Sequence, residues 1–432
     1  MSKLFTKKLG LTLIGSATAL TLMACGGNGE ETDTESNDMT EVETEGKSLT
    51  LGVWGGNDAE ESSLDSLISQ FEEETGAEIE KKVYTDYNTQ IQTDLIGGTA
   101  PDVFYVDFAM FDFFEEQDTL MELDPELFEI DAFYETLVES FSNDEGGLYA
   151  IPKDMSTLSL YLNEDIFEAA GVSIDEVPGS LEEYVDWLPG FQEKIDEAYP
   201  DEDVFAMSYT PELSRTYHLM QRGDGDVITE DGMANLDDPT VIENLQILTD
   251  LKETGAYVTP QDVGTGWNGE AFGIGKIAIM DEGNWVYQTL NDEFSDVTFT
   301  VKEMPTYKGE PGSMMFSVGW GKYAGTEESE LADLWIQHVT GAEGMQEWVE
   351  GTGTLPSRQD VAEAADITSN PDLNIHLEAW EFATPWQDGV TLTTVSNAFN
   401  NYLPTVMNGE ETWEAAMEEA NNQANSDIEA AN

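Results

Sequence analysis

Ten tryptophans give this chain a large supply of flat aromatic side chains. A flat ring can cover an apolar face of a ligand, and carboxylate, amide or guanidinium groups beside it can fix the ligand's polar atoms. Some tryptophans, such as Trp335, Trp348 and Trp413, lie on predicted helical faces. Five others lie in turns containing Gly or Pro, or at the ends of predicted elements. We expect these five to be binding platforms, with core packing as the alternative for each: Trp54, Trp267, Trp285, Trp320 and Trp386.

Polar side chains near these turns supply the second half of such a site. Asp107 follows a predicted strand, and Arg358 follows a Leu-Pro-Ser turn. Arg358 could bind a ligand hydroxyl or pair with an acid. The remaining polar candidates, for which a surface or structural role is the alternative, are Tyr87, Asp154, Tyr209 and Asn268.

Motifs for cofactor or metal chemistry are weak. The segment 264–269 fits the Gly-x-Gly-x-x-Gly pattern, but bulky Trp267 occupies its middle and no clear strand precedes it. The three histidines are far apart in the sequence, and the one cysteine, Cys25, cannot by itself form a disulfide or a thiolate metal site. We therefore predict no catalytic residues, no cofactor and no metal.

The charge of the chain is extremely negative. Its 432 residues contain 16 Lys+Arg against 89 Asp+Glu, for a formal net charge of −73. Nucleic-acid binding needs a basic surface, so that class is excluded. Hydrophobic residues still make up 40% of the chain, enough for a substantial core under an acidic surface. Carboxylates that repel one another favour a compact state only when salt screens them, so we predict a source in a saline habitat.

The N-terminus reads as a secretion signal. Lys3, Lys7 and Lys8 precede an uncharged apolar stretch over 9–23 that is too short for an ordinary membrane span. It ends on Leu-Met-Ala-Cys, which resembles a bacterial lipobox and implies lipidation of Cys25. We predict a signal peptide over 1–24, then the lipidated cysteine and an acidic, disordered linker over 25–47. The protein would then be anchored to the outer face of the cell membrane.

The start of the folded body alternates strand and helix. Residues 49–54 predict a buried strand, and Leu64, Leu67 and Phe71 fall on one helical face. A strand over 79–84, a second helix and a strand over 103–106 complete a βαβαβ order. That order indicates an α/β fold with a parallel sheet, in which ligands bind beyond the carboxyl ends of the strands.

Several segments in order resemble one family, the extracellular solute-binding proteins of carbohydrate ABC transporters, which are maltose-binding-protein-like. The matching segments cover nearly the whole folded body: 51–54, 71–76, 98–104, 150–152 with 160–163, 275–280 with 283–285, 304–305, 319–321 and 354–358. The family carries far more lysine than this chain. The resemblance implies two α/β lobes joined by hinge strands and closing on a solute. By position, the first lobe is expected to hold 48–153 and 318–355, and the second 154–317 and 356–432.

The resemblance also implies a function. Trp285 would stack on a sugar, and Trp54 and Asp107 would line the wall of the first lobe. The expected partners are a sugar or oligosaccharide, ABC permease subunits and the membrane, with the receptor a monomer. An excess of Trp over Arg in the candidate site favours sugar over anions. Two alternatives stay open: a surface-anchored glycoside-active enzyme, which needs only two suitably spaced carboxylates, and a receptor of the same fold for a non-sugar solute.

Overall fold

The structure is a computed structural model that describes residues 43–431. The predicted signal peptide, Cys25 and most of the predicted linker lie outside the described residues. The strands are β1 (Ser48–Trp54), β2 (Glu78–Tyr84), β3 (Val103–Asp107), β4 (Ala150–Asn163), β5 (Phe205–Ser208), β6 (Tyr257–Val258), β7 (Ile277–Gly283), β8 (Phe299–Lys302), β9 (Met314–Lys322) and β10 (Thr384–Pro385).

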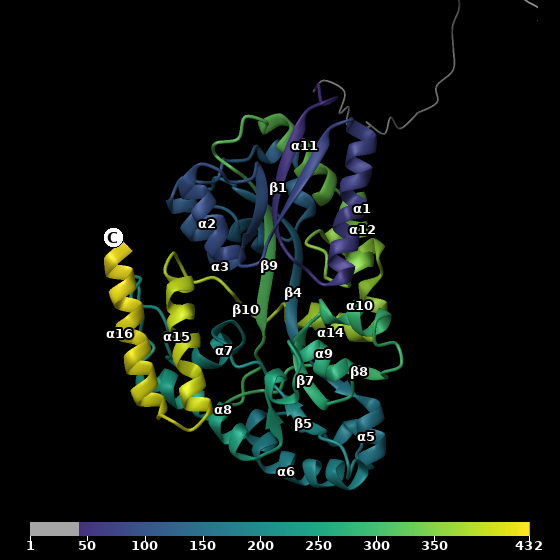
Figure 1. The fold of residues 1–432 in the computed structure, drawn as a ribbon, viewed down its shortest axis with the longest axis vertical. Helices are drawn as coiled ribbons and strands as arrows, with labels where there is room; N and C mark the ends of the chain where they lie inside the picture. Colours follow the sequence, from purple (N-terminus) through teal and green to yellow (C-terminus); the bar gives the residue numbers. More distant parts are fainter. Residues whose placement is uncertain (1–42, 432) are drawn as a thin grey trace, which may run out of the picture. The chain divides into compact units, whose positions relative to one another are not determined.

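Helices surround these strands on both sides (Figure 1). They are α1 (Asp58–Thr75), α2 (Tyr87–Gly97), α3 (Phe108–Glu116), α4 (Glu135–Ser140), α5 (Glu164–Ala170), α6 (Leu181–Ala198), α7 (Leu213–Met220), α8 (Pro239–Glu253), α9 (Asn268–Gly273), α10 (Val286–Asp292), α11 (Ser329–Thr340), α12 (Ala342–Thr352), α13 (Gln359–Ala364), α14 (Pro371–Ala379), α15 (Leu392–Met407) and α16 (Trp413–Ala431). Among the described residues, no helix is long and apolar enough to cross a membrane.

The predicted βαβαβ unit is confirmed. Strand β1 pairs in parallel with both β2 and β3. Helix α1 begins after Asn57, whose side chain accepts a hydrogen bond from the Glu60 backbone N–H. It ends at Gly76, which adopts the left-handed conformation that glycine takes without strain. The apolar face of α1 is buried as the spacing predicted.

Strand β4 runs through both halves of the sheet and is buried along its whole length. Residues Ala150–Thr157 pair with β9, which in turn pairs with β3. Residues Leu158–Asn163 pair instead with β7 and β8. The strand order is therefore β2-β1-β3-β9-β4-β7-β5-β6, with β4 and β9 at the centre of Figure 1.

Two large hydrophobic cores lie along this sheet. One gathers residues from β1 to Met155 and from Met315 to Leu373. The other gathers residues from Leu158 to Met314, together with Trp386 and the buried residues of helices α15 and α16. The change of core therefore falls where β4 changes its pairing partners.

Trp320 lies inside strand β9 and not in a turn or at an element end, as its flanking glycines had suggested. Those glycines serve strand packing. A Cβ at Gly319 would lie 2.8 Å from Ala150 Cβ, and one at Gly321 would lie 2.6 Å from Val106 Cγ2. The Gly-Trp-Gly pattern thus marks a close approach of neighbouring strands.

A buried histidine ties α14 to strand β4. His376 Nδ1 lies 2.8 Å from the Thr157 carbonyl oxygen, and its Nε2 lies 2.9 Å from the Tyr161 hydroxyl. Because Nδ1 faces a carbonyl, the neutral ring donates from Nδ1 and accepts from Tyr161 at Nε2. Burial lowers the pKa of His376 to about 3, so the ring is neutral in the folded protein.

This neutral histidine predicts acid sensitivity. The unfolded chain takes up the proton near the ordinary His pKa of about 6.5, so the contribution of His376 is complete above that pH and is lost as pH falls toward 3. Replacement His376→Gln removes this proton uptake. Urea unfolding at pH 4, 5 and 6 should give a free-energy slope smaller than wild type by up to about 1.4 kcal/mol per pH unit. Identical slopes for the two proteins would contradict the assignment.

Candidate functional site

Four aromatic side chains meet where β1 and β3 end. The rings of Trp54 and Tyr105 are 4.7 Å apart between centroids, and those of Tyr105 and Trp320 are 4.5 Å apart. Tyr87 packs edge-on against Trp54 at 5.3 Å and donates its hydroxyl to the Tyr105 carbonyl oxygen. Tyr87, Tyr105 and Trp320 are buried, whereas Trp54 is half-buried. Trp54 is therefore the member that can offer a ring to a ligand.

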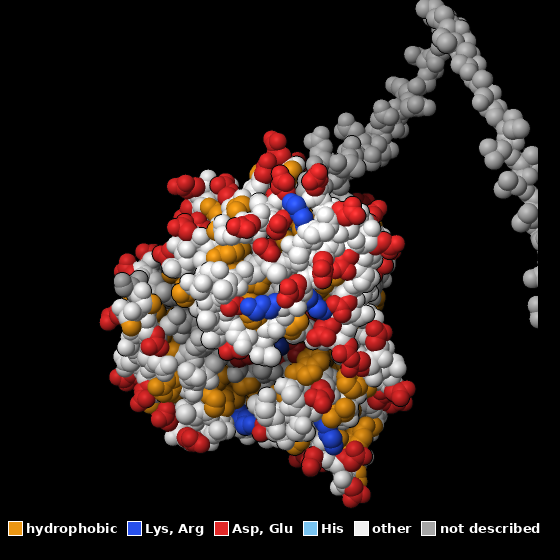
Figure 2. All heavy atoms as spheres, turned by 45° about the horizontal axis from the view of Figure 1, so that its top comes forward, with side chains coloured by type: hydrophobic (Ala, Val, Ile, Leu, Met, Phe, Trp, Pro, Cys, Tyr) orange, Lys and Arg blue, Asp and Glu red, His pale blue; other side chains and the backbone are white. Residues whose placement is uncertain are grey.

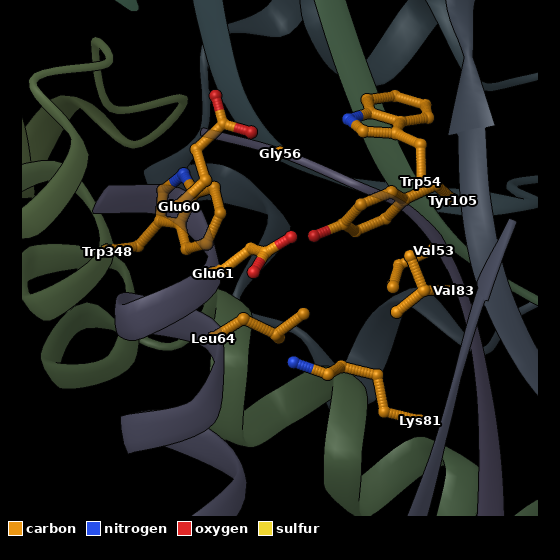
Figure 3. A pocket seen from close by; sticks show the side chains of 10 residues that line it. All are labelled: Val53, Trp54, Gly56, Glu60, Glu61, Leu64, Lys81, Val83, Tyr105 and Trp348. Carbon is orange, nitrogen blue, oxygen red and sulfur yellow. The ribbon is translucent and has the colours of Figure 1, made fainter. Parts of the chain in front are cut away.

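A small pocket lies between these strand ends and helix α1 (Figure 3). Tyr105 and Trp348 face each other across it, and the carboxylate of Glu61 points toward the Tyr105 hydroxyl. The full lining is Val53, Trp54, Gly56, Glu60, Glu61, Leu64, Lys81, Val83, Tyr105 and Trp348. Aromatic walls with carboxylates between them suit a ligand that has apolar faces and hydroxyl groups.

A buried ion pair fixes Trp348 beside this pocket. Lys153 and Asp154 pair with each other, and each side chain is 8% exposed. The Trp348 indole N–H donates to Asp154 Oδ2 at 2.8 Å, and Lys153 Nζ lies 4.0 Å from the Trp348 ring centroid. Burial raises the pKa of Glu60, and Lys153 opposes that rise. Because the Asp154 carboxylate is buried and bonds both Lys153 and Trp348, it holds the Trp348 wall of the pocket in place and is not exposed to a ligand.

A second aromatic group forms around Trp285. This residue precedes α10, and its half-buried ring meets Phe316 of β9 at 5.7 Å in an edge-on arrangement. A Cβ at Gly283 would lie 2.2 Å from the Trp285 ring, so glycine is needed for the indole to fold back over the backbone. The guanidinium carbon of Arg215 lies 5.9 Å from the centroid of the same ring.

Strand β9 relates the two aromatic groups. Phe316 and Trp320 are four residues apart, so their side chains leave the same face of the strand. At about 3.3 Å per residue, their Cα atoms are separated by roughly 13 Å. The groups around Trp54 and Trp285 therefore attach to one strand face at an interval longer than a single sugar ring.

The other predicted residues lie outside these two groups or support them. Asp107 is half-buried and caps α3 by accepting from the Ala109 N–H at 2.9 Å, and burial raises its pKa to about 6. Trp386 is buried edge-on against Tyr217 at 5.6 Å. Arg358 is buried and bonds Glu129 at 3.1 Å and Asp360 at 2.8 Å. Arg358 was expected either to bind a ligand hydroxyl or to pair with an acid, and the structure shows the pairing with acids.

Tyr209 and Asn268 support the strands behind Trp285. Asn268 accepts from the Ser208 hydroxyl at 2.7 Å, and the Tyr209 hydroxyl donates to the Arg215 carbonyl oxygen at 3.0 Å. Half-buried Trp267 precedes α9. A Cβ at Gly269 would lie 2.2 Å from its ring, which accounts for the third glycine of the Gly-x-Gly-x-x-Gly pattern without a nucleotide. Within residues 43–431, no group of His, Cys, Asp or Glu is arranged to hold a metal ion.

Sequence reasoning missed Glu60, Tyr105, Trp348 and Arg215. Trp348 had been assigned to a helical face, which is correct, but that face borders the pocket. Tyr105 lies within a strand whose apolar run predicts burial only. A signal was available for Glu60, because it lies just after Trp54 and a Gly-Gly turn. Arg215 carried none, since its buried partners Asp281 and Glu282 are 66 and 67 residues away in the sequence.

Comparison with known proteins identifies the family. A model of the family described as bacterial extracellular solute-binding protein matches residues 66–375. The chain therefore belongs to the bacterial extracellular solute-binding proteins. It is 22% identical over 391 residues to the maltodextrin-binding protein MdxE of Bacillus subtilis, covering 88% of this chain and 87% of that protein.

Solved structures share the two-lobed fold of this family. The ABC substrate-binding protein Lmo0181 from Listeria monocytogenes, in complex with cycloalternan, has a TM-score of 0.77 at 19% identity, covering 89% of this chain and 99% of that one. The GacH receptor of Streptomyces glaucescens, solved unliganded and with acarbose, has a TM-score of 0.75 at 22% identity, covering 87% and 97%. The predicted α/β class is confirmed.

Proposed function

We propose that this protein is a receptor that binds a sugar or oligosaccharide between two closing lobes and delivers it to an ABC importer. The observation that carries the proposal is the pair of half-buried tryptophans, Trp54 and Trp285, in aromatic groups set along one face of β9. Carboxylates in the adjoining pocket supply hydrogen-bond acceptors. The relatives named for maltodextrin, cycloalternan and acarbose support this solute class.

We further propose two lobes, the first holding 48–153 and 318–355, and the second 154–317 and 356–432. Met155, Met315, Val361, Ile367 and Leu373 pack in the first core. The cores therefore favour placing these five residues in the first lobe, with its last border beyond Leu373. Closure follows the solute only if the solute binds the closed state more tightly than the open one. We propose no enzymatic activity, and a monomeric receptor.

The sugar proposal predicts a ligand response that depends on Trp285. Tryptophan fluorescence and thermal shift against a panel of mono- and oligosaccharides in high salt should show saturable binding, with the sugar recovered intact. Replacement Trp285→Ala should weaken that binding at least about tenfold, or ~1.4 kcal/mol, because a stacking face is lost.

Trp187→Ala is the matched control. Trp187 is also a partly buried tryptophan, but it stacks on Phe191 of α6 and contacts neither aromatic group of the candidate site. It should bind sugar like wild type. Cleaved sugar would support the enzyme alternative, and a response to amino acids, peptides or phosphate esters alone would support another solute.

We also propose that the chain is exported and held outside the cell by lipid on Cys25. The Lys-rich start, the apolar stretch and the Leu-Met-Ala-Cys ending support this, as does membership of an extracellular family. Two acyl chains give stable anchoring, since each buried methylene contributes about 0.8 kcal/mol. Mass spectrometry of the N-terminal peptide from membranes should find a diacylated Cys25, and Cys25→Ser should move the protein out of the membrane fraction. Unmodified Cys25 in the membrane-associated protein would contradict the proposal.

Finally, we propose a halophilic protein that needs salt to stay folded. Acidic side chains are spread over the face seen in Figure 2, where basic ones are sparse. The few basic side chains are themselves paired with acids. All three arginines of the described residues form ion pairs with Asp or Glu, and so do Lys153 and Lys322 of the central strands.

Salt should therefore raise the melting temperature. The Debye length falls from about 8 Å in physiological salt to about 3 Å at 1 M, so molar NaCl screens repulsion between surface carboxylates. We expect a rise of at least about 4 °C between low salt and 1 M NaCl, corresponding to ~3 kcal/mol for a protein of this size. Sucrose as a neutral osmolyte separates screening from preferential exclusion. An unchanged melting temperature in NaCl would contradict the proposal.

A further inference from the structure

An arginine whose charge is more than balanced lies beside the Trp285 ring. Arg215 belongs to α7, and its side chain is 12% exposed. Its Nη2 bonds Glu282 Oε1 at 2.7 Å, and its Nε bonds Glu212 Oε1 at 3.1 Å. Asp281 Oδ2 lies 3.7 Å from Nη1. Two carboxylates in direct contact already exceed the single positive charge of the guanidinium.

The burial of these acids fixes the arginine in place. Glu282 is 1% exposed and Asp281 is fully buried. Burial lowers the pKa of Arg215, but Glu282, Asp281 and Glu212 together raise it above its usual range. Burial raises the pKa of Asp281 well above its usual range, so Glu282 is the buried carboxylate that the guanidinium neutralises. The guanidinium therefore stays charged and cannot leave Glu282 without leaving that buried carboxylate unpaired, which is costly.

The same guanidinium keeps donors available. It has five N–H groups, and its hydrogen bonds to Glu212, to Glu282 and to the Asp281 carbonyl oxygen, the last at 3.4 Å, use three of them. Two N–H groups then have no protein acceptor among the described residues. The guanidinium carbon lies 5.9 Å from the centroid of the half-buried Trp285 ring, on which a bound sugar would present its hydroxyls.

Among the described residues, the other basic groups near the two aromatic groups are already paired. Lys153 pairs with Asp154, and Lys81 of the neighbouring pocket pairs with Asp65. Glu60 and Glu61 border the same pocket. A carboxylate on a ligand would therefore meet like charges and no unpaired basic group. Like-charge placement of this kind rejects wrong ligands.

We propose that Arg215, with its charge cancelled by Glu212 and Glu282, is a specificity-determining residue that binds hydroxyls of an uncharged saccharide and excludes uronate sugars. This inference rests on the proposed sugar receptor and narrows its substrate class. Arg215 donates hydrogen bonds at the edge of the Trp285 platform, and the two glutamates prevent it from acting as an anion site.

The test compares neutral sugars with matched anions. Maltotriose and cellotriose, each beside its C6-oxidised uronate form, are titrated into the full chain by calorimetry in 1 M and 3 M NaCl. We expect at least one neutral sugar to bind at least about tenfold more tightly than its oxidised form at both salt concentrations. Equal or tighter binding of the uronate would overturn this inference and leave the sugar receptor standing. Binding of none of the four would overturn this inference, whereas the receptor proposal depends on the wider panel.

Three variants assign the effect to Arg215. Arg215→Met should weaken neutral-sugar binding about tenfold, since donors to the ligand are lost. Glu282→Gln should reduce the difference in affinity between the neutral sugar and its oxidised form, because part of the positive charge of Arg215 is then uncompensated. Should Glu282→Gln fail to fold, Glu212→Gln makes the same test, because Glu212 is 41% exposed. Glu310→Gln breaks an ion pair with Arg222 that lies outside the site and should change neither affinity. An unchanged gap in both glutamate variants would overturn the role of charge cancellation.

Discussion

The whole molecule depends on one strand that belongs to two halves. All fourteen residues of β4 are buried, so every backbone N–H and C=O in it needs a partner. The strand meets this demand with β9 along its first part and with β7 and β8 along its second. The hydrophobic cores separate where the pairing partners change. Disrupting β4 would therefore disturb both hydrophobic cores, because the strand contributes residues to each of them. Disrupting β2, which lies at the end of the strand order, would not.

The position of the candidate site follows from this arrangement. Strand β9 lies beside β4 and has aromatic side chains at Phe316 and Trp320 on one face. Trp320 and Trp54 pack in or against the first core, and Phe316 and Trp285 pack against the second, so a solute that touches both aromatic groups also contacts both cores. Binding to both groups would then favour one relative placement of the two cores, and only a difference in affinity between placements can shift that equilibrium.

The local order of elements could be predicted from the sequence, because short-range spacing determines it. The strands over 49–54 and 103–106 and the apolar face of α1 were predicted correctly, since buried positions recur with the period of the element. Trp320 was misplaced because Gly-Trp-Gly is compatible both with a turn and with closely packed strands. Only the neighbours Ala150 and Val106, distant in the sequence, decide between these two.

The candidate site shows the same limit more strongly. Its tryptophans were expected from residue type, but the charged side chains that contact Trp285 and Trp348 were not. Arg215 and Glu282 are 67 residues apart and make a 2.7 Å bond, and Asp154 reaches the indole of Trp348 across 194 residues. Such long-range partners decide whether a charged residue attracts an oppositely charged ligand or has its charge neutralised by the protein. An arginine beside an indole is compatible with an anion site on residue type alone. The buried glutamate in contact with it, which periodicity does not reveal, changes that chemistry to hydrogen bonding with neutral hydroxyls.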